Sequence, residues 1–518
     1  MPYTPNNPLI PGDPSSYDLK WIVQQIKAWK DPLDSAERAE DAAEAAALSA
    51  AEAQAAAGTI DQPFVTPEMF GAEGDGTTDD RAAFTAAFAT GKPVFCHGGK
   101  TYGVEIKAGD TNAISIPAGG VLNLNGATIQ LLNPNSLDTY NVIDCNNITG
   151  AIIFNGEIKG DKLVHVGSSG EHAHGITIFD SHNIIVQNVK ISNCWGDGVY
   201  IGGWTKSSHI IVKDVHCYNN RRNGISLVNG SDVKIEGCTL EDTNGTAPQL
   251  GIDVETDLAS YYIDKVVISD CSFINNPGGA LNIYIHGDDA SIICKGLNAD
   301  GAISVDLKGV RSRAVLTDIN SKPKNGQDAF VAGCVAESAV IFDDFIVDAG
   351  NILTAVCTFA YDEPHENISL KGKVTNGTLD RIIRSYTQDH HNCSVELTMD
   401  DSVVVNNLDE VLDNTEPSNY TDIYYTDTRD TNVYLKAVTL NRIPDSASSA
   451  NVNLWYGANQ RIWHALVNDD SVQHNAIGST FEDITTGTQA NLVNIAAGAA
   501  MYYKYDPIKD VVYYYMSA

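Results

Sequence analysis

Two carboxylates lie close together in the middle of the chain, in the run Gly251-Ile-Asp-Val-Glu. Asp253 and Glu255 are two residues apart, so on a β-strand both side chains point to the same side, with Cα atoms about 6.5–7 Å apart. Hydrolysis of a glycosidic bond usually needs two carboxyl groups, one as proton donor and one as base or nucleophile. We therefore take Asp253 and Glu255 as candidate catalytic residues, with Asp197 as a third. The plainer interpretation is that they are ordinary acids among 66 and that Gly196-Asp197-Gly198 is a turn.

Aromatic and basic side chains lie near these acids in the sequence, and they have the chemistry to bind a sugar. Aromatic rings can stack on a pyranose, and an arginine fork can hold the carboxylate of an acidic sugar. The candidate substrate-binding residues are Tyr200, Trp195, Trp204, Arg221, Arg222 and His174.

Elimination from a uronate is the alternative chemistry, and it needs a base to take the proton α to the carboxylate. The candidates for such a base are Arg221, Arg222, His172 and His174. The plainer interpretation of the two histidines is that they lie in a loop.

These residues belong to a repeated pattern of short strands. Five successive units begin Gly175-Ile-Thr-Ile-Phe, Gly198-Val-Tyr-Ile-Gly, Gly224-Ile-Ser-Leu-Val, Gly251-Ile-Asp-Val-Glu and Ala280-Leu-Asn-Ile-Tyr, spaced by 23, 26, 27 and 29 residues. A second strand follows in four units, at 184–186, 210–212, 233–235 and 266–268. A period of this length with short strands predicts a β-solenoid, with stacked parallel coils over about 95–405.

The alternation within each first strand assigns side chains to the inside and the outside of the coil. The second residues, Ile176, Val199, Ile225 and Ile252, should stack in the interior. The third residues, which include Tyr200 and Asp253, should project outward in one column. Cys194, Cys217, Cys238 and Cys271 follow the second strands, and we expect them to form one buried internal stack.

The remainder of the chain divides by composition. Residues 1–33 are proline-rich with a short amphipathic helix, which suggests a segment that docks into a larger particle, although packing on its own chain is the plainer alternative. Residues 34–59 are alanine-rich and predict a helical stalk bundled with copies of itself. Residues 60–419 would form the solenoid, and 420–518 a β-rich C-terminal domain for trimerisation or glycan binding.

The run Met69-Phe-Gly-Ala-Glu-Gly-Asp-Gly-Thr-Thr-Asp-Asp-Arg-Ala-Ala-Phe84 resembles the opening of the pectate-lyase-like right-handed parallel β-helix found in phage tailspikes. Its glycines permit a tight loop, and Thr78 or Asp79 would cap a helix over 81–89. Asp75, Asp79 and Asp80 could form a calcium loop or a catalytic cluster, but loop and cap roles are the simpler interpretation. The resemblance covers about 60–405 and, with the stalk, implies a trimeric virion protein.

Composition narrows the class of partner. Lys plus Arg is 33 and Asp plus Glu is 66, and a formal net charge of −33 disfavours nucleic acids and anionic membranes. No run of 18 apolar residues and no export signal is seen, so we expect synthesis in the host cytoplasm, no membrane insertion and reduced thiols. Neither a metal-ligand spacing nor a cofactor motif appears.

Together, these observations and the resemblance imply a phage tailspike that recognises and depolymerises a host surface polysaccharide, by glycosidase rather than lyase chemistry. It would be a homotrimer in the virion tail, attached to tail or baseplate proteins through residues 1–33. The alternative on the same scaffold is a non-catalytic receptor-binding or structural appendage. A secreted polysaccharide lyase is disfavoured by the stalk and the missing signal.

Overall fold

The computed structural model describes residues 63–405, apart from 108, 133–135, 336, 351, 361–364, 386–392 and 401, and the backbone of eight strands between 422 and 516. The predicted docking segment (1–33) and stalk (34–59) lie outside the described residues.

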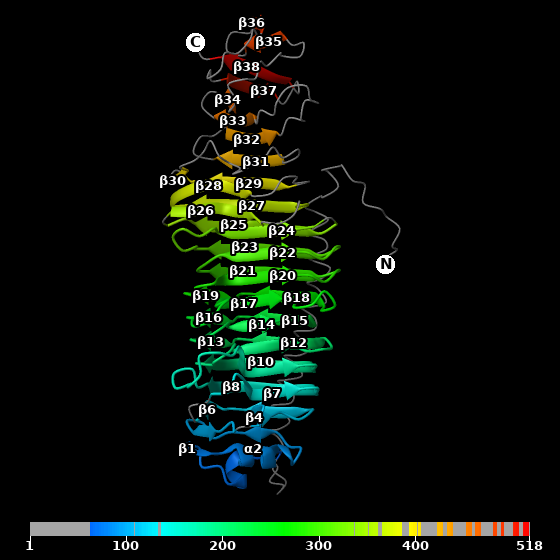
Figure 1. Cartoon of the computed structure of the whole chain (residues 1–518), viewed down its shortest axis with the longest axis vertical. Coiled ribbons are helices and arrows are strands. Elements are labelled where there is room, and N and C mark those ends of the chain that lie inside the picture. The colour runs from blue at the N-terminus through cyan, green and yellow to red at the C-terminus, as the bar shows by residue number, and fades with distance from the viewer. Residues whose placement is uncertain are drawn as a thin grey trace, which may run out of the picture. The chain divides into compact units, whose positions relative to one another are not determined.

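Stacked coils of a right-handed parallel β-helix make up most of the described chain (Figure 1). Each coil contributes to two sheets, and every pairing from the first to the thirtieth strand is parallel. One sheet has 12 strands. They are β4 (Asn112–Ser115), β7 (Thr139–Asn146), β9 (His172–Phe179), β11 (Val199–Gly202), β14 (Ile225–Leu227), β17 (Leu250–Glu255), β20 (Gly279–Ile285), β22 (Ile303–Leu307), β24 (Phe330–Cys334), β26 (Ile352–Phe359), β28 (Gly377–Ser385) and β30 (Val403–Val405).

The other sheet has 18 strands, because most coils cross it in two short segments with a bend between them. They are β1 (Asp75–Asp79), β2 (Val94–Phe95), β3 (Thr101–Val104), β5 (Gly120–Asn123), β6 (Thr128–Leu131), β8 (Thr149–Lys159), β10 (His182–Ser192), β12 (Ser207–Lys213), β13 (His216–Tyr218), β15 (Gly230–Glu236), β16 (Thr239–Glu241), β18 (Ile263–Ser269), β19 (Ser272–Ile274), β21 (Ser291–Ala299), β23 (Arg313–Ser321), β25 (Ala339–Asp348), β27 (Ile368–Thr375) and β29 (Ser394–Met399).

The predicted repeat register is confirmed. Ile176, Val199, Ile225 and Ile252 are aligned on successive strands of the 12-stranded sheet, and all four are fully buried. The predicted second strands align in the same way in the 18-stranded sheet. Stacking of aliphatic side chains from coil to coil therefore forms the core, as expected for a solenoid in which each coil contacts only its neighbours.

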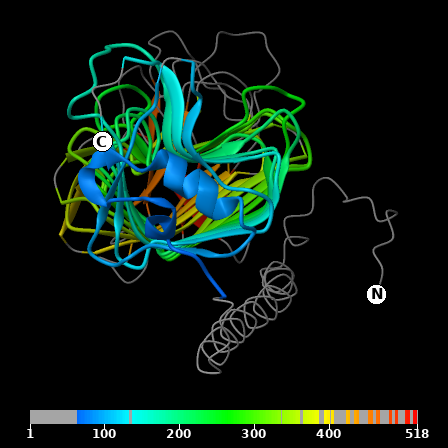
Figure 2. The ribbon, with the colours of Figure 1, turned by 90° about the horizontal axis from the view of Figure 1, so that it is seen from below.

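The first coil is covered by a short helix, α2 (Arg81–Phe88), seen across the end of the stack in Figure 2. A 3₁₀ turn, η2 (Pro67–Phe70), precedes it. Phe84 and Phe88 of α2 are buried, which protects the apolar end of the core. The N-cap is Asp80 rather than the predicted Thr78 or Asp79. Asp79 nonetheless accepts a hydrogen bond from the backbone N–H of Arg81 at 3.3 Å.

The acids of the opening loop are engaged by the chain's own donors. Asp75 accepts the backbone N–H groups of Thr77 and Thr78, and Asp80 accepts those of Glu73 and Gly74. These contacts match the loop and cap interpretation. No group of three acids, cysteines or histidines arranged to hold a metal occurs among the residues described.

The cysteines are buried, but the expected single stack is wrong. All ten are buried free thiols. The register aligns Cys217 with Leu240, whereas Cys238 lies one residue before that position and aligns with Cys271. Cys194 follows the end of its strand and donates its backbone N–H to Asn220. The register across the bend is the same in these coils, but the four thiols lie at different distances after the aligned second strands: eight residues after Val186, five after Val212, and three after Ile235 and Ile268. They therefore fall in different interior columns.

The bend inside the 18-stranded sheet uses one left-handed residue per coil. These residues form a column with φ between 51° and 65°: Asn155, Asn188, Asp214, Gly237, Asp270, Gly296, Asp318 and Asp344. Asparagine, aspartate and glycine tolerate this backbone conformation best. At Gly237 and Gly296 the space above the backbone is already filled. A β-carbon on Gly296 would lie 2.5 Å from Oδ1 of Asp270, and one on Gly237 would overlap Asp214 in the same way.

Strand pairing changes in the C-terminal part. β31 (Asp422–Asp427) pairs with β32 (Val433–Val438), and β35 (Thr480–Asp483) with β36 (Thr488–Asn491), in antiparallel fashion. A four-stranded antiparallel sheet contains β33 (Val452–Gly457), β34 (Ile462–Val467), β37 (Met501–Asp506) and β38 (Val511–Met516). No helix in the described part of the chain is long and apolar enough to cross a membrane.

Candidate functional site

Two columns of polar side chains run along the outward face of the 12-stranded sheet. The first, which we name the outward column, is Ser115, Asp144, Thr177, Tyr200, Ser226, Asp253 and Asn282. The second lies three residues earlier on each coil, and we name it the leading column: Asn112, Asn141, His174, Asp197 and Asn223. The predicted placement of Tyr200 and Asp253 in one outward column is confirmed.

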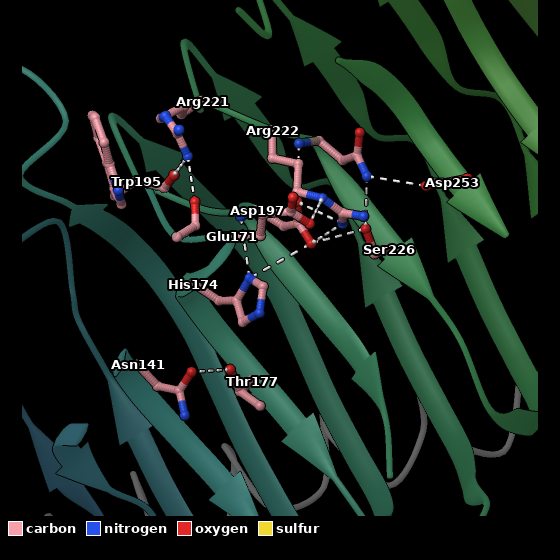
Figure 3. Close-up of polar contacts among 12 residues, drawn as sticks. Asn141, Glu171, His174, Thr177, Trp195, Asp197, Arg221, Arg222, Ser226 and Asp253 are labelled. Atoms are coloured by element: carbon pink, nitrogen blue, oxygen red, sulfur yellow. Dashed lines mark hydrogen bonds and ion pairs between the residues drawn. The ribbon is translucent and has the colours of Figure 1, made fainter. Parts of the chain in front are cut away.

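Asp197 is the centre of a buried polar network (Figure 3). Its carboxylate lies 3.2 Å from Nη1 of Arg222, and it accepts hydrogen bonds from the hydroxyl of Ser226 at 2.9 Å and the backbone N–H of Asn223 at 3.0 Å. Burial raises the pKa of Asp197, and Arg222, Ser226 and Asn223 oppose that rise. Glu171 lies 3.5 Å from Nε of Arg222, so the guanidinium is held between two acids.

Asp253 and Glu255 have different surroundings although they share one strand, β17. Both carboxylate oxygens of Asp253 accept side-chain amide donors, from Asn282 at 2.9 Å and Asn223 at 3.2 Å. Glu255 is half-buried and accepts no hydrogen bond from the described residues. Burial raises the pKa of both carboxyls, and for Glu255 the charges of Asp253 and Asp257 add to the rise.

Two of the three candidate acids are buried. Asp253 is only 3% exposed and Asp197 is fully buried. Alternation correctly places Asp253 on the outward side, but neighbouring polar side chains such as Asn223 and Asn282 surround it. An outward position on a strand is therefore not the same as a solvated one.

His174 is a buried, neutral hydrogen-bond acceptor on a strand rather than a loop residue. It lies on β9, and its Nδ1 accepts the backbone N–H of Asp197 at 3.1 Å, so the ring proton is on Nε2. Burial, assisted by the charge of Arg222 and by His172, lowers the pKa of His174 well below its usual value. The 3.5 Å approach of Nδ1 to the Asp197 carboxylate is accordingly not an ion pair. Tyr200 stacks on this imidazole at 4.7 Å between ring centres.

Trp195 and Arg221 hold a loop in place. Arg221 is buried and donates to the backbone carbonyls of Ser168 and Gly170, at 3.1 and 2.5 Å. Its guanidinium lies 4.0 Å from the centre of the Trp195 ring, and that ring also stacks on His165 at 3.9 Å. With their donors and faces occupied, these two side chains are not brought together with Asp253 and Glu255 as free sugar-binding groups.

Trp204 is different, because it is 77% exposed and, among the described residues, its ring makes a single edge contact, with Phe179 at 6.2 Å between ring centres. An indole this exposed keeps a free face on which an apolar sugar face can stack. It lies just beyond the end of β11, on the same coil as Tyr200.

Sequence reasoning missed the neutral and acidic residues that complete the site. Asn223 and Ser226 connect Asp197 and Asp253 from the coil between them, Asn282 holds Asp253 from the next coil, and Glu171 completes the surroundings of Arg222. The repeat register could have indicated the first three, because each of them lies in the outward or the leading column beside a candidate residue. Glu171 lies before β9 in a loop without repeat register, so no pattern marked it.

Comparison with known proteins gives the same fold. The family model for the right-handed β-helix region matches residues 96–295. A pre-neck appendage protein of Bacillus phage B103 is 24% identical over 43% of this chain and 27% of its own length. A K30/K69-specific capsule depolymerase of Klebsiella phage K64-1 is 28% identical over 35% of this chain and 25% of its own length. These matches confirm the resemblance to the parallel β-helix family of phage tailspikes.

Among solved structures, the A-module of a mannuronan C-5 epimerase of Azotobacter vinelandii is similar, with 12% identity over 70% of this chain and all of the module, and a TM-score of 0.47. The chain spans at most 57% of the length of the curated relatives it matches, which include two Bacillus subtilis proteins.

Proposed function

We propose that this chain is a phage tail protein that binds a bacterial surface polysaccharide and hydrolyses it on the outward face of the 12-stranded sheet. In this proposal Glu255 is the proton donor and Asp253 the base or nucleophile. Asp197 keeps Arg222 in position, and Tyr200 and Trp204 stack on sugar rings.

The difference between the surroundings of Glu255 and Asp253 carries the proposal. A hydrolase needs one carboxyl that keeps its proton and one that loses it. Burial raises the pKa of both carboxyls, but amide donors on both oxygens of Asp253 oppose that rise and favour its ionised form, whereas the charges of Asp253 and Asp257 add to the rise in the pKa of Glu255 and favour a retained proton. The two residues are two apart on β17, which sets their Cα atoms about 6.5–7 Å apart.

The state of the candidate bases favours hydrolysis over elimination. The Nδ1 lone pair of His174 is occupied by a backbone N–H, so that nitrogen cannot accept a proton from a sugar. Arg221 donates to backbone carbonyls, and Arg222 is paired with Asp197 and Glu171. Of the four candidates, only His172 is exposed, and no hydrogen bond from the described residues occupies its ring nitrogens.

The relatives support the biological setting. One is named as an appendage of a phage and another as a capsule depolymerase, so we place this chain in the virion tail with a capsule-like polysaccharide as its substrate. The homotrimer and the attachment to tail proteins through residues 1–33 remain predictions from the sequence.

The test is incubation of the full chain with purified capsular polysaccharides and O-antigens, followed by measurement of new reducing ends. Glu255→Gln should lower the cleavage rate by about 10³-fold, since a positioned proton donor contributes on the order of 10²–10⁴. Glu236→Gln, the same substitution on the other sheet, is the matched control and should leave the rate unchanged. Products with a new carbon–carbon double bond, detected by ultraviolet absorbance, would show elimination and refute the hydrolase assignment.

A binding-only appendage is the second candidate, and the burial of Asp253 favours it. At 3% exposure this carboxylate offers little surface to a substrate, and its two amide partners could serve only to stabilise the coil. In that case the polysaccharide would bind the wild-type chain and remain intact.

A further inference from the structure

A cavity of about 420 Å³ lies between α2 and the first strand of the 12-stranded sheet, β4. Its apolar lining includes Phe88, Ala89 and Ala113, and its polar lining consists of Asn112, Ser115, Thr85 and the ion pair of Arg81 with Asp110. None of these residues is part of the candidate site around Asp253.

The cavity nevertheless lies at the start of the two polar columns that lead to that site. Asn112 is the first member of the leading column, and Ser115 is the first member of the outward column. The outward column leads from Ser115 to Asp253 in five steps between coils. At about 4.8 Å for each step, the two ends are ~24 Å apart, which is the length of an oligosaccharide of several sugar residues.

Hydrogen bonds join the cavity to the next coil. Asn112 donates to the hydroxyl of Ser115 at 2.5 Å and to the carboxylate of Asp144 at 3.2 Å. Asn141 donates to the same carboxylate at 3.1 Å and accepts the hydroxyl of Thr177 at 2.5 Å. The polar groups from the cavity towards His174 are thus held in fixed orientations.

The lining suits one sugar unit. A pyranose has an apolar face of C–H groups and a rim of hydroxyls, and small ligand sites combine an apolar wall with a few placed polar groups. Here Phe88, Ala89 and Ala113 supply the wall. The polar side consists of Ser115, whose hydroxyl is oriented by Asn112, together with Thr85 and the ion pair of Arg81 with Asp110.

We propose that this cavity is a distal glycan-binding subsite, which holds a sugar residue of the same chain whose scissile bond lies at Asp253 and Glu255. The inference rests on the proposed function and deepens it, because it gives the polysaccharide a direction along the solenoid axis. It predicts that recognition depends on glycan length.

The raised pKa of Asp144 fits this position. Burial raises it to about 6, with the hydrogen bond from Asn141 acting against the rise. This carboxyl and Ser115 accept the two N–H groups of Asn112, so the Ser115 hydroxyl is oriented with its own proton directed to a bound sugar.

The experiment blocks the cavity and varies the glycan length. Ala89 lies at the end of α2, is exposed and lines the cavity, so Ala89→Tyr should fill it without touching the core. Ala86→Tyr, at an exposed position of the same helix that does not line the cavity, is the matched control. Ser115→Ala is a second variant, which removes one hydroxyl and adds no bulk.

The probe is capsular polysaccharide that the wild-type chain binds, partly hydrolysed with acid and separated by size, with affinity measured by calorimetry. We expect Ala89→Tyr to weaken binding of long fragments about tenfold, or ~1.4 kcal/mol, and to leave binding of disaccharides unchanged. Ser115→Ala should shift the same length dependence in the same direction, and Ala86→Tyr should match the wild type.

Equal affinities of wild type and both cavity variants for every fragment length would overturn the distal subsite, even if the wild type cleaves the polymer. If the wild type cleaves nothing but Ala89→Tyr still loses affinity for long fragments, the subsite stands and the catalytic proposal fails. Weaker binding of long fragments by Ala86→Tyr as well would also overturn it, because the effect would then not come from the cavity.

Discussion

The outward residues of both sheets follow the same alternation along the strands, but those of one sheet are exposed to solvent and several of those of the other are buried. On the 18-stranded sheet, outward residues form half-exposed ion pairs between coils, such as Lys213 with Glu236 at 3.2 Å. On the 12-stranded sheet, Asp197 and Asp253 are buried and surrounded by donors from neighbouring coils. A charge that leaves water needs specific partners, whereas a solvated one does not. The same repeat pattern can therefore build a solvated surface or a buried polar network.

The largest expected effect is on the buried network. Asp197→Ala would leave Arg222 with much of its charge buried and only the more distant Glu171 as a partner. Breaking a buried ion pair from one side costs about 3–5 kcal/mol. We expect the free energy of unfolding to fall by about 3 kcal/mol, measured by urea denaturation. Asp197→Asn, which keeps the shape of the side chain, should lower the free energy of unfolding by less. Surface substitutions usually change it by no more than about 0.5 kcal/mol. A fall below that value for Asp197→Ala would mean that the buried network contributes no more to stability than the exposed ion pairs of the other sheet.

An intermediate effect should appear as a pH dependence. The pKa of Asp144 is raised from 3.8 to about 6 in the folded chain, so the folded form binds a proton that the unfolded chain has already lost. Stability should therefore decrease as pH rises from about 4 to about 6, by up to about 3 kcal/mol, and stay lower above that range.

Urea unfolding at several pH values, compared between wild type and Asp144→Asn, isolates this contribution. The raised pKa values of Asp197, Asp253 and Glu255 add slopes of the same sign, and these should remain in the variant. Parallel curves for the two proteins across this pH range would contradict the assignment to Asp144.

The smallest effect belongs to the solvated face. Lys213→Ala removes the partner of Glu236, and both side chains are about 30% exposed. Surface ion pairs contribute roughly 0–1 kcal/mol to stability, so Lys213→Ala should hardly change the urea midpoint of unfolding. Salt screens such pairs, so the change should be smaller still at high ionic strength. A loss comparable to that of Asp197→Ala would erase the contrast between the two sheets.

Local pattern was sufficient to predict the fold, because each coil repeats one alternation of apolar and polar residues. The interior column through Ile176 and Val199 and the outward place of Asp253 both follow from a period of two. The cysteine stack failed because the thiols lie at different offsets after the aligned second strands, eight residues after Val186 but three after Ile235, so a constant register places them in different columns.

The site was predictable only in part, since burial on the outward side depends on residues far away in the sequence. Trp195 and Arg221 have the chemistry of a sugar site, yet they hold the loop that contains Ser168 and Gly170. The tautomer of His174 is set by a backbone N–H on the next coil. Neither fact can be read from residue types or from their spacing.

The left-handed bend column also limits how such a protein can be rebuilt from its repeats. The side chain of Asp214 occupies the space above Gly237, and that of Asp270 occupies the space above Gly296. Other neighbours in this column both carry side chains, and the amide of Asn188 donates to Oδ1 of Asn155 at 2.8 Å. The restriction therefore applies to two pairs of coils, those of Asp214 with Gly237 and of Asp270 with Gly296. Recombination that moves each of these pairs together keeps the aspartate beside its glycine, whereas replacing only the glycine-bearing coil by one with a side chain would place two groups in one space.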